Sequence, residues 1–131
     1  MTTLDFTISV AGVKETAYLT CNNNDVSIIF SMNNGFCKTY TDSNFYTCFG
    51  RIREDNPNIL FLCKGFKINV HPSSMSAQMS LGLKAYELTM GKAPTRDDIV
   101  YIFDYDDKNL TNNPEEQRDY FIKWIKSKKT S

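Results

Sequence analysis

Hydrophobic and polar residues alternate along the first 40 positions of the chain. The first apolar run consists of Leu4, Phe6, Ile8 and Val10. This period of two is typical of a strand with one buried face. Turn-forming residues interrupt the alternation at Ala11-Gly12, at the Asn-rich segment 22–25 and at Asn33-Asn34-Gly35. The pattern predicts an antiparallel meander of strands at 4–10, 13–21, 26–32 and 36–40.

Two later segments have the helical period instead. The first carries apolar residues at positions i, i+3, i+4 and i+7, namely Phe45, Cys48, Phe49 and Ile52. It predicts a helix over 43–54, capped by Asp42 or Ser43. The second begins at Asn113-Pro114, a sequence typical of a helix start, and runs to about Ser127. Its apolar stripe consists of Tyr120, Phe121, Trp124 and Ile125.

The segment between the two helices mixes short strands and turns. Residues 58–63 are mostly apolar, which predicts a strand that is buried on both faces. After a Lys64-Gly65 turn, residues 66–70 are expected to pair back with it. A Pro-Ser-Ser sequence predicts a short helix near 73–80. Two further strands are expected at 83–90 and 99–103.

Together these elements predict an α+β fold in a single domain, 1–131. We expect a curved, mostly antiparallel sheet of six to eight strands, with a mid-chain helix, a short helix near 73–80 and a C-terminal helix. The length of 131 residues fits one domain, and 41% hydrophobic residues are sufficient for one core.

The charge balance and the apolar content argue against several classes of partner. The 15 basic and 15 acidic residues cancel, so no overall field attracts nucleic acid or an anionic membrane. The N-terminal residues lack the basic and apolar regions of a secretion signal. No window approaches the roughly 18 uncharged apolar residues that a bilayer span needs. We therefore expect a cytoplasmic protein without a nucleic-acid or membrane partner.

The cysteines do not indicate a metal site. Cys21, Cys37, Cys48 and Cys63 have no C-x-x-C spacing, and His71 is the only histidine. Zinc sites usually contain at least one closely spaced pair of ligands, so no metal or other cofactor is expected. Free thiols, mostly buried as small apolar side chains, are expected instead.

His71 is also the only histidine that could serve in acid–base catalysis. Nucleophilic catalysis would require a partner such as Ser73, Ser74 or Cys63, together with an orienting acid. The residues around the two serines have no nucleophile-elbow pattern and suit a helix start. We therefore expect no catalytic residues and a protein that is not an enzyme.

Acidic residues are concentrated toward the C-terminus. Between Asp97 and Asp119 the chain has eight acidic and two basic residues, a net charge of −6 over 23 residues. Tyr105 lies within this region, as an aromatic anchor among acids that would suit a Lys- or Arg-rich surface. The predicted partner-binding residues are Asp97, Asp98, Asp104, Tyr105, Asp106 and Asp107. A solvated loop and helix start would account for the same acids, so both interpretations stay open.

A family resemblance covers residues 58–125 best. The motif C-K-G-x-K-I-N-V-x-P-S-x-M-x-x-Q-M-x-x-G-x-x-A-Y-x-L-x-x-G-K begins at Cys63, and D-x-V-x-I-F-D follows from Asp98. The segment resembles small bacterial immunity proteins that are encoded beside polymorphic toxins, including those of contact-dependent growth inhibition. The resemblance implies a non-enzymatic cytoplasmic inhibitor that binds one cognate toxin domain, often a nuclease with a basic cleft. Since the motif marks turns and a helix start, it assigns no binding residue.

Two other functions stay open on the sequence alone. One is a small enzyme or ligand-binding domain that uses a pocket near His71, Ser73 and Tyr86. The other is binding of single-stranded nucleic acid through exposed aromatic residues on the sheet, which would require a basic face. A toxin gene upstream of the gene for this chain would favour immunity over both.

Overall fold

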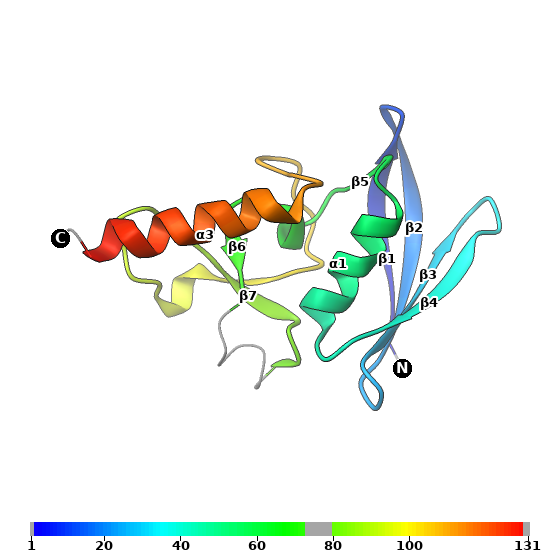
Figure 1. Cartoon of the computed structure of the whole chain (residues 1–131). Helices are drawn as coiled ribbons and strands as arrows, with labels where there is room; N and C mark the ends of the chain where they lie inside the picture. Colours follow the sequence, from blue (N-terminus) through cyan, green and yellow to red (C-terminus); the bar gives the residue numbers. More distant parts are fainter. Residues whose placement is uncertain (1, 73–79, 130–131) are drawn as a thin grey trace.

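A computed structural model describes residues 2–72 and 80–129 and shows the expected α+β fold (Figure 1). Eight strands form two antiparallel sheets. The larger has the order β4-β3-β2-β1-β5, with β1 at Thr2–Val10, β2 at Val13–Asn22, β3 at Ser27–Met32, β4 at Cys37–Thr41 and β5 at Ile59–Phe61. The smaller has the order β6-β7-β8, with β6 at Val70–His71, β7 at Lys84–Glu87 and β8 at Ile99–Tyr101. The described chain also contains the helices α1 (Phe45–Asp55) and α3 (Pro114–Lys129) and the 3₁₀ turns η1 (Lys64–Phe66) and η2 (Arg96–Asp98).

The first four strands form the predicted meander because the turns between them follow the local sequence. Val10 pairs with Val13 across a two-residue turn, in which Ala11 and Gly12 both have positive φ. The twist of such a turn matches that of the strands it joins. The Asn33-Asn34-Gly35 segment connects β3 to β4 in the same antiparallel sense, as predicted.

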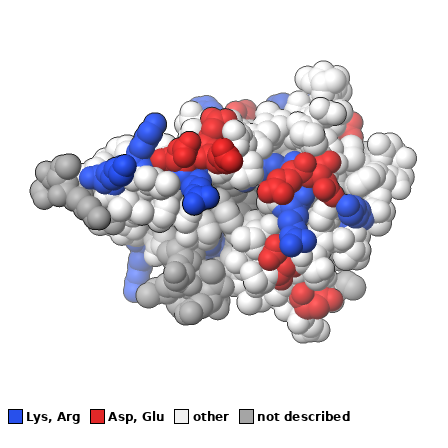
Figure 2. All heavy atoms as spheres, in the orientation of Figure 1, with Lys and Arg blue, Asp and Glu red and all other residues white. Residues whose placement is uncertain are grey.

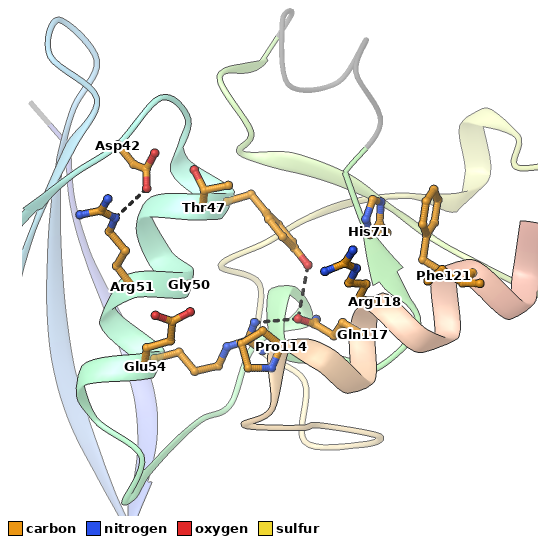
Figure 3. Close-up of a pocket in the computed structure, with 13 residues that line it drawn as sticks. Asp42, Thr47, Gly50, Arg51, Glu54, His71, Pro114, Gln117, Arg118 and Phe121 are labelled. Carbon is orange, nitrogen blue, oxygen red and sulfur yellow. Dashed lines mark hydrogen bonds and ion pairs between the residues drawn. The ribbon is translucent and has the colours of Figure 1, made fainter.

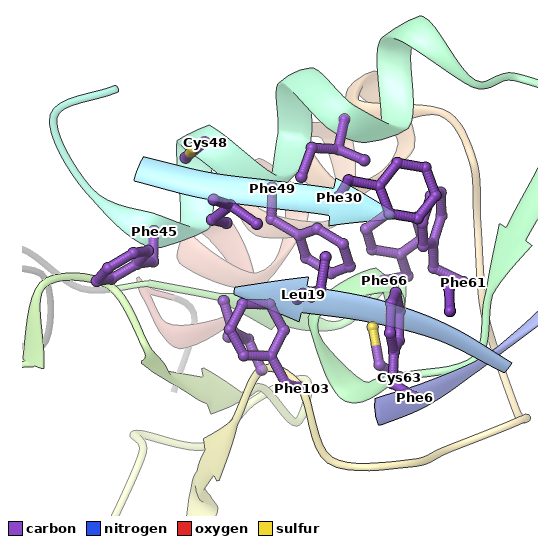
Figure 4. Close-up of a cluster of buried hydrophobic side chains, with 14 of the residues drawn as sticks. Phe6, Leu19, Phe30, Phe45, Cys48, Phe49, Phe61, Cys63, Phe66 and Phe103 are labelled. Atoms are coloured by element: carbon purple, nitrogen blue, oxygen red, sulfur yellow. The ribbon is translucent and has the colours of Figure 1, made fainter. Parts of the chain in front are cut away.

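Because apolar and polar residues alternate along the strands, one face of the five-stranded sheet is buried against α1 (Figure 4). Figure 1 shows the sheet curling around this helix. The predicted apolar stripe of α1 is buried throughout, at Phe45, Cys48, Phe49 and Ile52. The Phe49 ring lies at the centre of the core, with centroids 4.7 to 6.0 Å from those of Phe6, Phe61, Phe66 and Phe103. The core therefore continues from the sheet through α1 to η1 and the residues after β8.

The chain leaves the five-stranded sheet earlier than the sequence predicts. Residues 66–70 do not pair back with β5, because the segment turns into η1 and then pairs with β7 through β6. The Gly65 amide donates to the Ile102 carbonyl at 2.9 Å. A Cβ at Gly65 would lie 3.1 Å from Ile102, so glycine permits this close approach. The amides of Lys64 and Gly65 and the carbonyl of Leu62 thus take their partners from the segment after β8.

The N-terminus of α1 also differs from the prediction. Its N-cap is Asn44 rather than Asp42 or Ser43, and the Asn44 side chain accepts a hydrogen bond from the Thr47 amide at 2.9 Å. The Asp42 carboxylate accepts instead from the Ser43 amide and from Arg51. Asn is as good an N-cap residue as Asp or Ser, so the cap lies one residue after the predicted Ser43 and the capping hydrogen bond is still made.

The C-terminal helix α3 starts at Pro114, as predicted, and lies over the three-stranded sheet (Figure 1). Trp124 from its predicted stripe is buried, and the indole N–H donates to the Lys92 carbonyl at 3.0 Å. The short helix predicted near 73–80 falls on residues 73–79, which lie outside the described part of the chain.

Candidate functional site

The predicted partner-binding residues lie in two places. Asp97 and Asp98 belong to η2, before β8, whereas the other four lie in the segment 104–107 after it. The Asp98 side chain accepts hydrogen bonds from the amide and hydroxyl of Thr95 and completes a capping box. The structure therefore gives Asp98 a local structural role and does not join it to the Asp104–Asp107 loop.

Asp106 fixes the Asp104–Asp107 loop to the rest of the molecule. One carboxylate oxygen lies 3.2 Å from Lys64 Nζ and 3.0 Å from Lys67 Nζ, and the other accepts from the Lys108 amide at 2.9 Å. Burial by itself raises the pKa of Asp106, but the Lys108 amide and the two lysines outweigh it and hold the pKa well below its usual value. Lys67 is itself buried and lies 3.5 Å from Glu87. Asp106 is thus an internal ion-pair partner.

Tyr105 presents its ring to solvent from this loop. Its side chain is 52% exposed, and Asp104 and Asp107 beside it are exposed as well. The Tyr105 backbone forms a bridge with Cys63. Its hydroxyl accepts from Lys14 Nζ at 3.3 Å and donates to Asp107 at 3.4 Å. The loop therefore displays an aromatic ring and two carboxylates from a backbone that is held in place.

Charges of both signs share the face formed by α1 and α3. Figure 2 shows red and blue atoms interleaved over these two helices. Along α3 the basic Arg118 lies among the acids Glu115, Glu116 and Asp119, and the bases Lys123 and Lys126 follow. The net charge of −6 between residues 97 and 119 therefore does not form one acidic face in this view.

A groove of about 660 Å³ lies between α1 and α3 (Figure 3). We call it the α1–α3 groove. Its lining includes Tyr46, Arg51, Glu54, Gln117, Arg118 and Phe121. The Arg51 guanidinium pairs with Asp42 at 2.8 Å across one end. Figure 3 shows Arg118 directed toward the middle of the groove, on the side of His71 and Gln117. The Arg118 side chain forms no ion pair or hydrogen bond with any residue in the described ranges 2–72 and 80–129.

The floor of the groove is a buried polar network that joins α1 to α3. Arg53 is only 4% exposed, and it donates to Gln117 Oε1 at 2.7 Å and to the Thr111 carbonyl at 3.2 Å. Gln117, also buried, donates to the carbonyls of Gly65 and Lys67 at 2.9 and 2.8 Å. One glutamine thus accepts a hydrogen bond from the arginine and donates to two backbone carbonyls at once.

Arg53 is a buried cation without a carboxylate partner. Within the described ranges 2–72 and 80–129, no carboxylate lies within ion-pair distance of it, and its Nε has no hydrogen-bond partner. Its guanidinium carbon lies 4.2 Å from the Phe66 ring centroid. Burial lowers the pKa of Arg53, but an arginine stays protonated under all ordinary conditions. The groove therefore has a fixed positive charge beneath it.

His71 stands between this groove and a second pocket. Its ring stacks on Phe121 at 3.8 Å with an interplanar angle of 6°. Burial lowers the pKa of His71 and favours its neutral form. The second pocket, of about 470 Å³, is lined by His71, Tyr86, Leu88, Phe121 and Trp124 among others. The structure pairs His71 with Tyr86 across β6 and β7, as the predicted pocket requires, whereas Ser73 lies outside the described residues.

Cys63, the cysteine considered above as a possible partner of His71, is not activated. Cys63 is fully buried, and burial raises the pKa of its thiol to about 12. Burial also raises the pKa values of Cys21 and Cys48 to about 11, whereas Cys37 is exposed. A protonated thiol is a poor nucleophile, so the three buried cysteines behave as small apolar side chains.

The sequence reasoning missed Arg53 and Gln117, although a signal was present. Arg53 follows Phe49 by four residues, and Gln117 precedes Tyr120 by three. Both polar residues therefore lie on the apolar stripe of their helix. A polar side chain at a core-facing position needs a buried hydrogen-bond partner. Arg53 and Gln117 are partners of each other.

Comparison with protein-family models and with curated proteins gives no match for this chain. Neither of the helices within the described residues has the length and apolar content that crossing a membrane requires.

Proposed function

We propose that this protein is a cytoplasmic immunity protein that binds a cognate toxin domain with a basic surface and neutralises it. The observation that carries the proposal is the exposed Tyr105 ring between the exposed acids Asp104 and Asp107, on a loop that Asp106 anchors. The resemblance of residues 58–125 to immunity proteins supports the same role.

An anchored loop of this kind suits tight binding for two physical reasons. A tyrosine that is already held in place loses little conformational entropy when it is buried by a partner. Carboxylates beside it attract lysine and arginine side chains and speed the encounter. Asp104 and Asp107 would supply this attraction, while Asp106 supplies rigidity because its charge is neutralised by two lysines.

The experiment measures association and dissociation rates with the toxin encoded next to this gene, at two salt concentrations. Asp107→Lys should lower the association rate about threefold to tenfold at low salt and weaken its salt dependence. Tyr105→Ala should mainly raise the dissociation rate, since a buried anchor acts after the encounter.

Asp97→Lys is the matched control, because it changes the same charge at the other end of β8. It should alter neither rate by more than about twofold. Equal effects of Asp97→Lys and Asp107→Lys would argue for a general field instead of the loop. Unchanged rates in both loop variants would exclude the loop as the interface.

A second candidate is binding of a small apolar ligand in the pocket between His71 and Trp124. The observation that favours it is the convergence of His71, Tyr86 and Trp124 on one pocket of about 470 Å³, a size within the usual range for ligand sites. Trp124 fluorescence should then respond saturably to an uncharged apolar probe such as N-phenyl-1-naphthylamine. Tyr86→Ala should change this response, and an unaltered titration would count against the pocket.

A further inference from the structure

We propose that the α1–α3 groove binds a small organic anion through a phosphate or carboxylate group. This site is independent of the proposed toxin interface, and its test uses the protein alone.

The first argument is the uncompensated charge of Arg53. A buried ion without a counterion is costly, because its interior surroundings replace hydration only in part. Here the guanidinium has a carbonyl, an amide oxygen and an aromatic ring around it, and Nε is left without a partner among the described residues. Because screening is weak beneath the surface, this charge favours an anion in the groove above it.

The second argument is the position of Arg118 on the facing wall. Its side chain is exposed, has no ion pair in the described chain, and points into the groove (Figure 3). A guanidinium presents paired donors that match the oxygens of phosphate and carboxylate. Arg118 can therefore bind the anion directly, while Arg53 acts through its field.

The third argument is the apolar surface next to these charges. Tyr46, Phe121 and Ile122 line the same groove, and Ile122 is one of the large apolar residues that stay exposed, at 40%. A bare inorganic ion would leave this surface in water. An organic anion would cover it, and a volume of about 660 Å³ is ample for one.

The acids of the groove lie on the α1 side. Asp42 is neutralised by Arg51 at 2.8 Å, so Glu54 is the lining carboxylate that opposes an anion. This asymmetry directs the anionic group toward the α3 wall. It also predicts that removal of the Glu54 charge strengthens binding.

The experiment is a titration of ¹⁵N-labelled protein, followed by amide chemical shifts at low ionic strength. The probes are phenyl phosphate, inorganic phosphate and phenol. Phenyl phosphate should bind saturably and shift amides of α1 and α3, inorganic phosphate should bind more weakly, and phenol should give no saturable shift. Arg118→Gln should weaken phenyl phosphate about tenfold, the loss typical of one charge-assisted hydrogen bond.

Lys123→Gln is the matched control. It removes one positive charge from an exposed position of α3 that does not line the groove, and it should weaken binding by less than about twofold. Glu54→Gln should strengthen binding. Equal losses for Arg118→Gln and Lys123→Gln, shifts that map elsewhere, or absence of saturable phenyl phosphate binding would each overturn the proposal. The amide spectra of the variants also report whether each one is folded.

Discussion

Two regions along the buried stripe of α1 are held by different kinds of contact. In the middle of the helix, Phe49 packs among four other phenylalanine rings beneath the five-stranded sheet. One turn later, Arg53 connects α1 to α3 through the Arg53–Gln117 network. Within residues 114–127 of α3, only Gln117 and Trp124 are buried. The sheet side thus rests on many shared apolar contacts, whereas the α3 side depends on a few positions.

This difference has an energetic consequence. Apolar packing is non-directional, so neighbouring rings can relax around a smaller side chain. A buried hydrogen-bond network has fixed partners, and the loss of one member leaves the others unsatisfied. The Arg53–Gln117 network, which we call the polar joint, therefore specifies how α3 docks, while the aromatic core supplies most of the stability. Four variants test this comparison, from the largest expected effect to the smallest.

Phe49→Ala should have the largest effect on the free energy of unfolding. The ring is 2% exposed and contacts four others, and truncation of such a phenylalanine costs about 3–5 kcal/mol. Chemical denaturation followed by circular dichroism would measure it. Phe49→Leu should lose markedly less, because it keeps most of the buried volume. A loss below about 1 kcal/mol for Phe49→Ala would show that the aromatic core is not the main source of stability.

Trp124→Ala should follow, with a loss of about 3 kcal/mol. The indole is buried, stacks on Phe121 of the same helix at 5.8 Å, and lines the second pocket together with Leu88. Trp124→Phe should lose about 1 kcal/mol, mainly the hydrogen bond to the Lys92 carbonyl. If Trp124→Ala changes the unfolding free energy by less than about 1 kcal/mol, the ring is not an anchor of α3.

Gln117→Leu should cost about 2 kcal/mol, because Arg53 loses its amide acceptor and two carbonyls lose their donor. Amide hydrogen exchange should show the loss of protection mainly in α3, with β1–β3 little changed. In a double-mutant cycle with Arg53→Met, the double variant should lose less stability than the sum of the losses of the two single variants. Additive losses, or an equal loss of protection in β1–β3, would contradict a separate polar joint.

Asp106→Asn should have the smallest effect, about 1–2 kcal/mol at neutral pH, and that effect should depend on pH. The folded-state pKa of Asp106 is lowered from its usual value of 3.8. Its contribution is therefore present above pH about 4 and is lost as the pH falls through the folded-state pKa. The difference between Asp106→Asn and the original chain should shrink toward acid pH. Asp107→Asn, at the exposed neighbouring acid, is the control and should change the free energy of unfolding by less than about 0.5 kcal/mol at neutral pH.

Much of the sheet side followed from local pattern. The period of two placed β1 to β4, the turn residues set their connections, and the i, i+3, i+4 spacing placed the buried face of α1. These features depend on residues that are close together in the sequence, so the order of apolar, polar and turn-forming residues over a short segment is enough to predict them. The same holds for the start of α3 at Pro114.

The candidate sites depended on contacts between distant segments. Periodicity could not show that Asp106 meets Lys64 and Lys67 about forty residues away. The sequence therefore predicts Asp106 as a partner-binding residue alongside Asp104 and Asp107. It also could not place Arg118 in a groove opposite α1.

The sequence by itself determined the strands β1 to β4 and their turns, the buried stripe of α1, the start of α3 and the α+β class. Only the tertiary structure decided the departure of residues 66–70 from β5, the internal pairing of Asp106, and the joint between Arg53 and Gln117. The physical reason is one of range. Backbone propensity and burial periodicity act between residues that are close in sequence, whereas a buried charge or amide is satisfied by whichever partner the folded chain brings within hydrogen-bond distance.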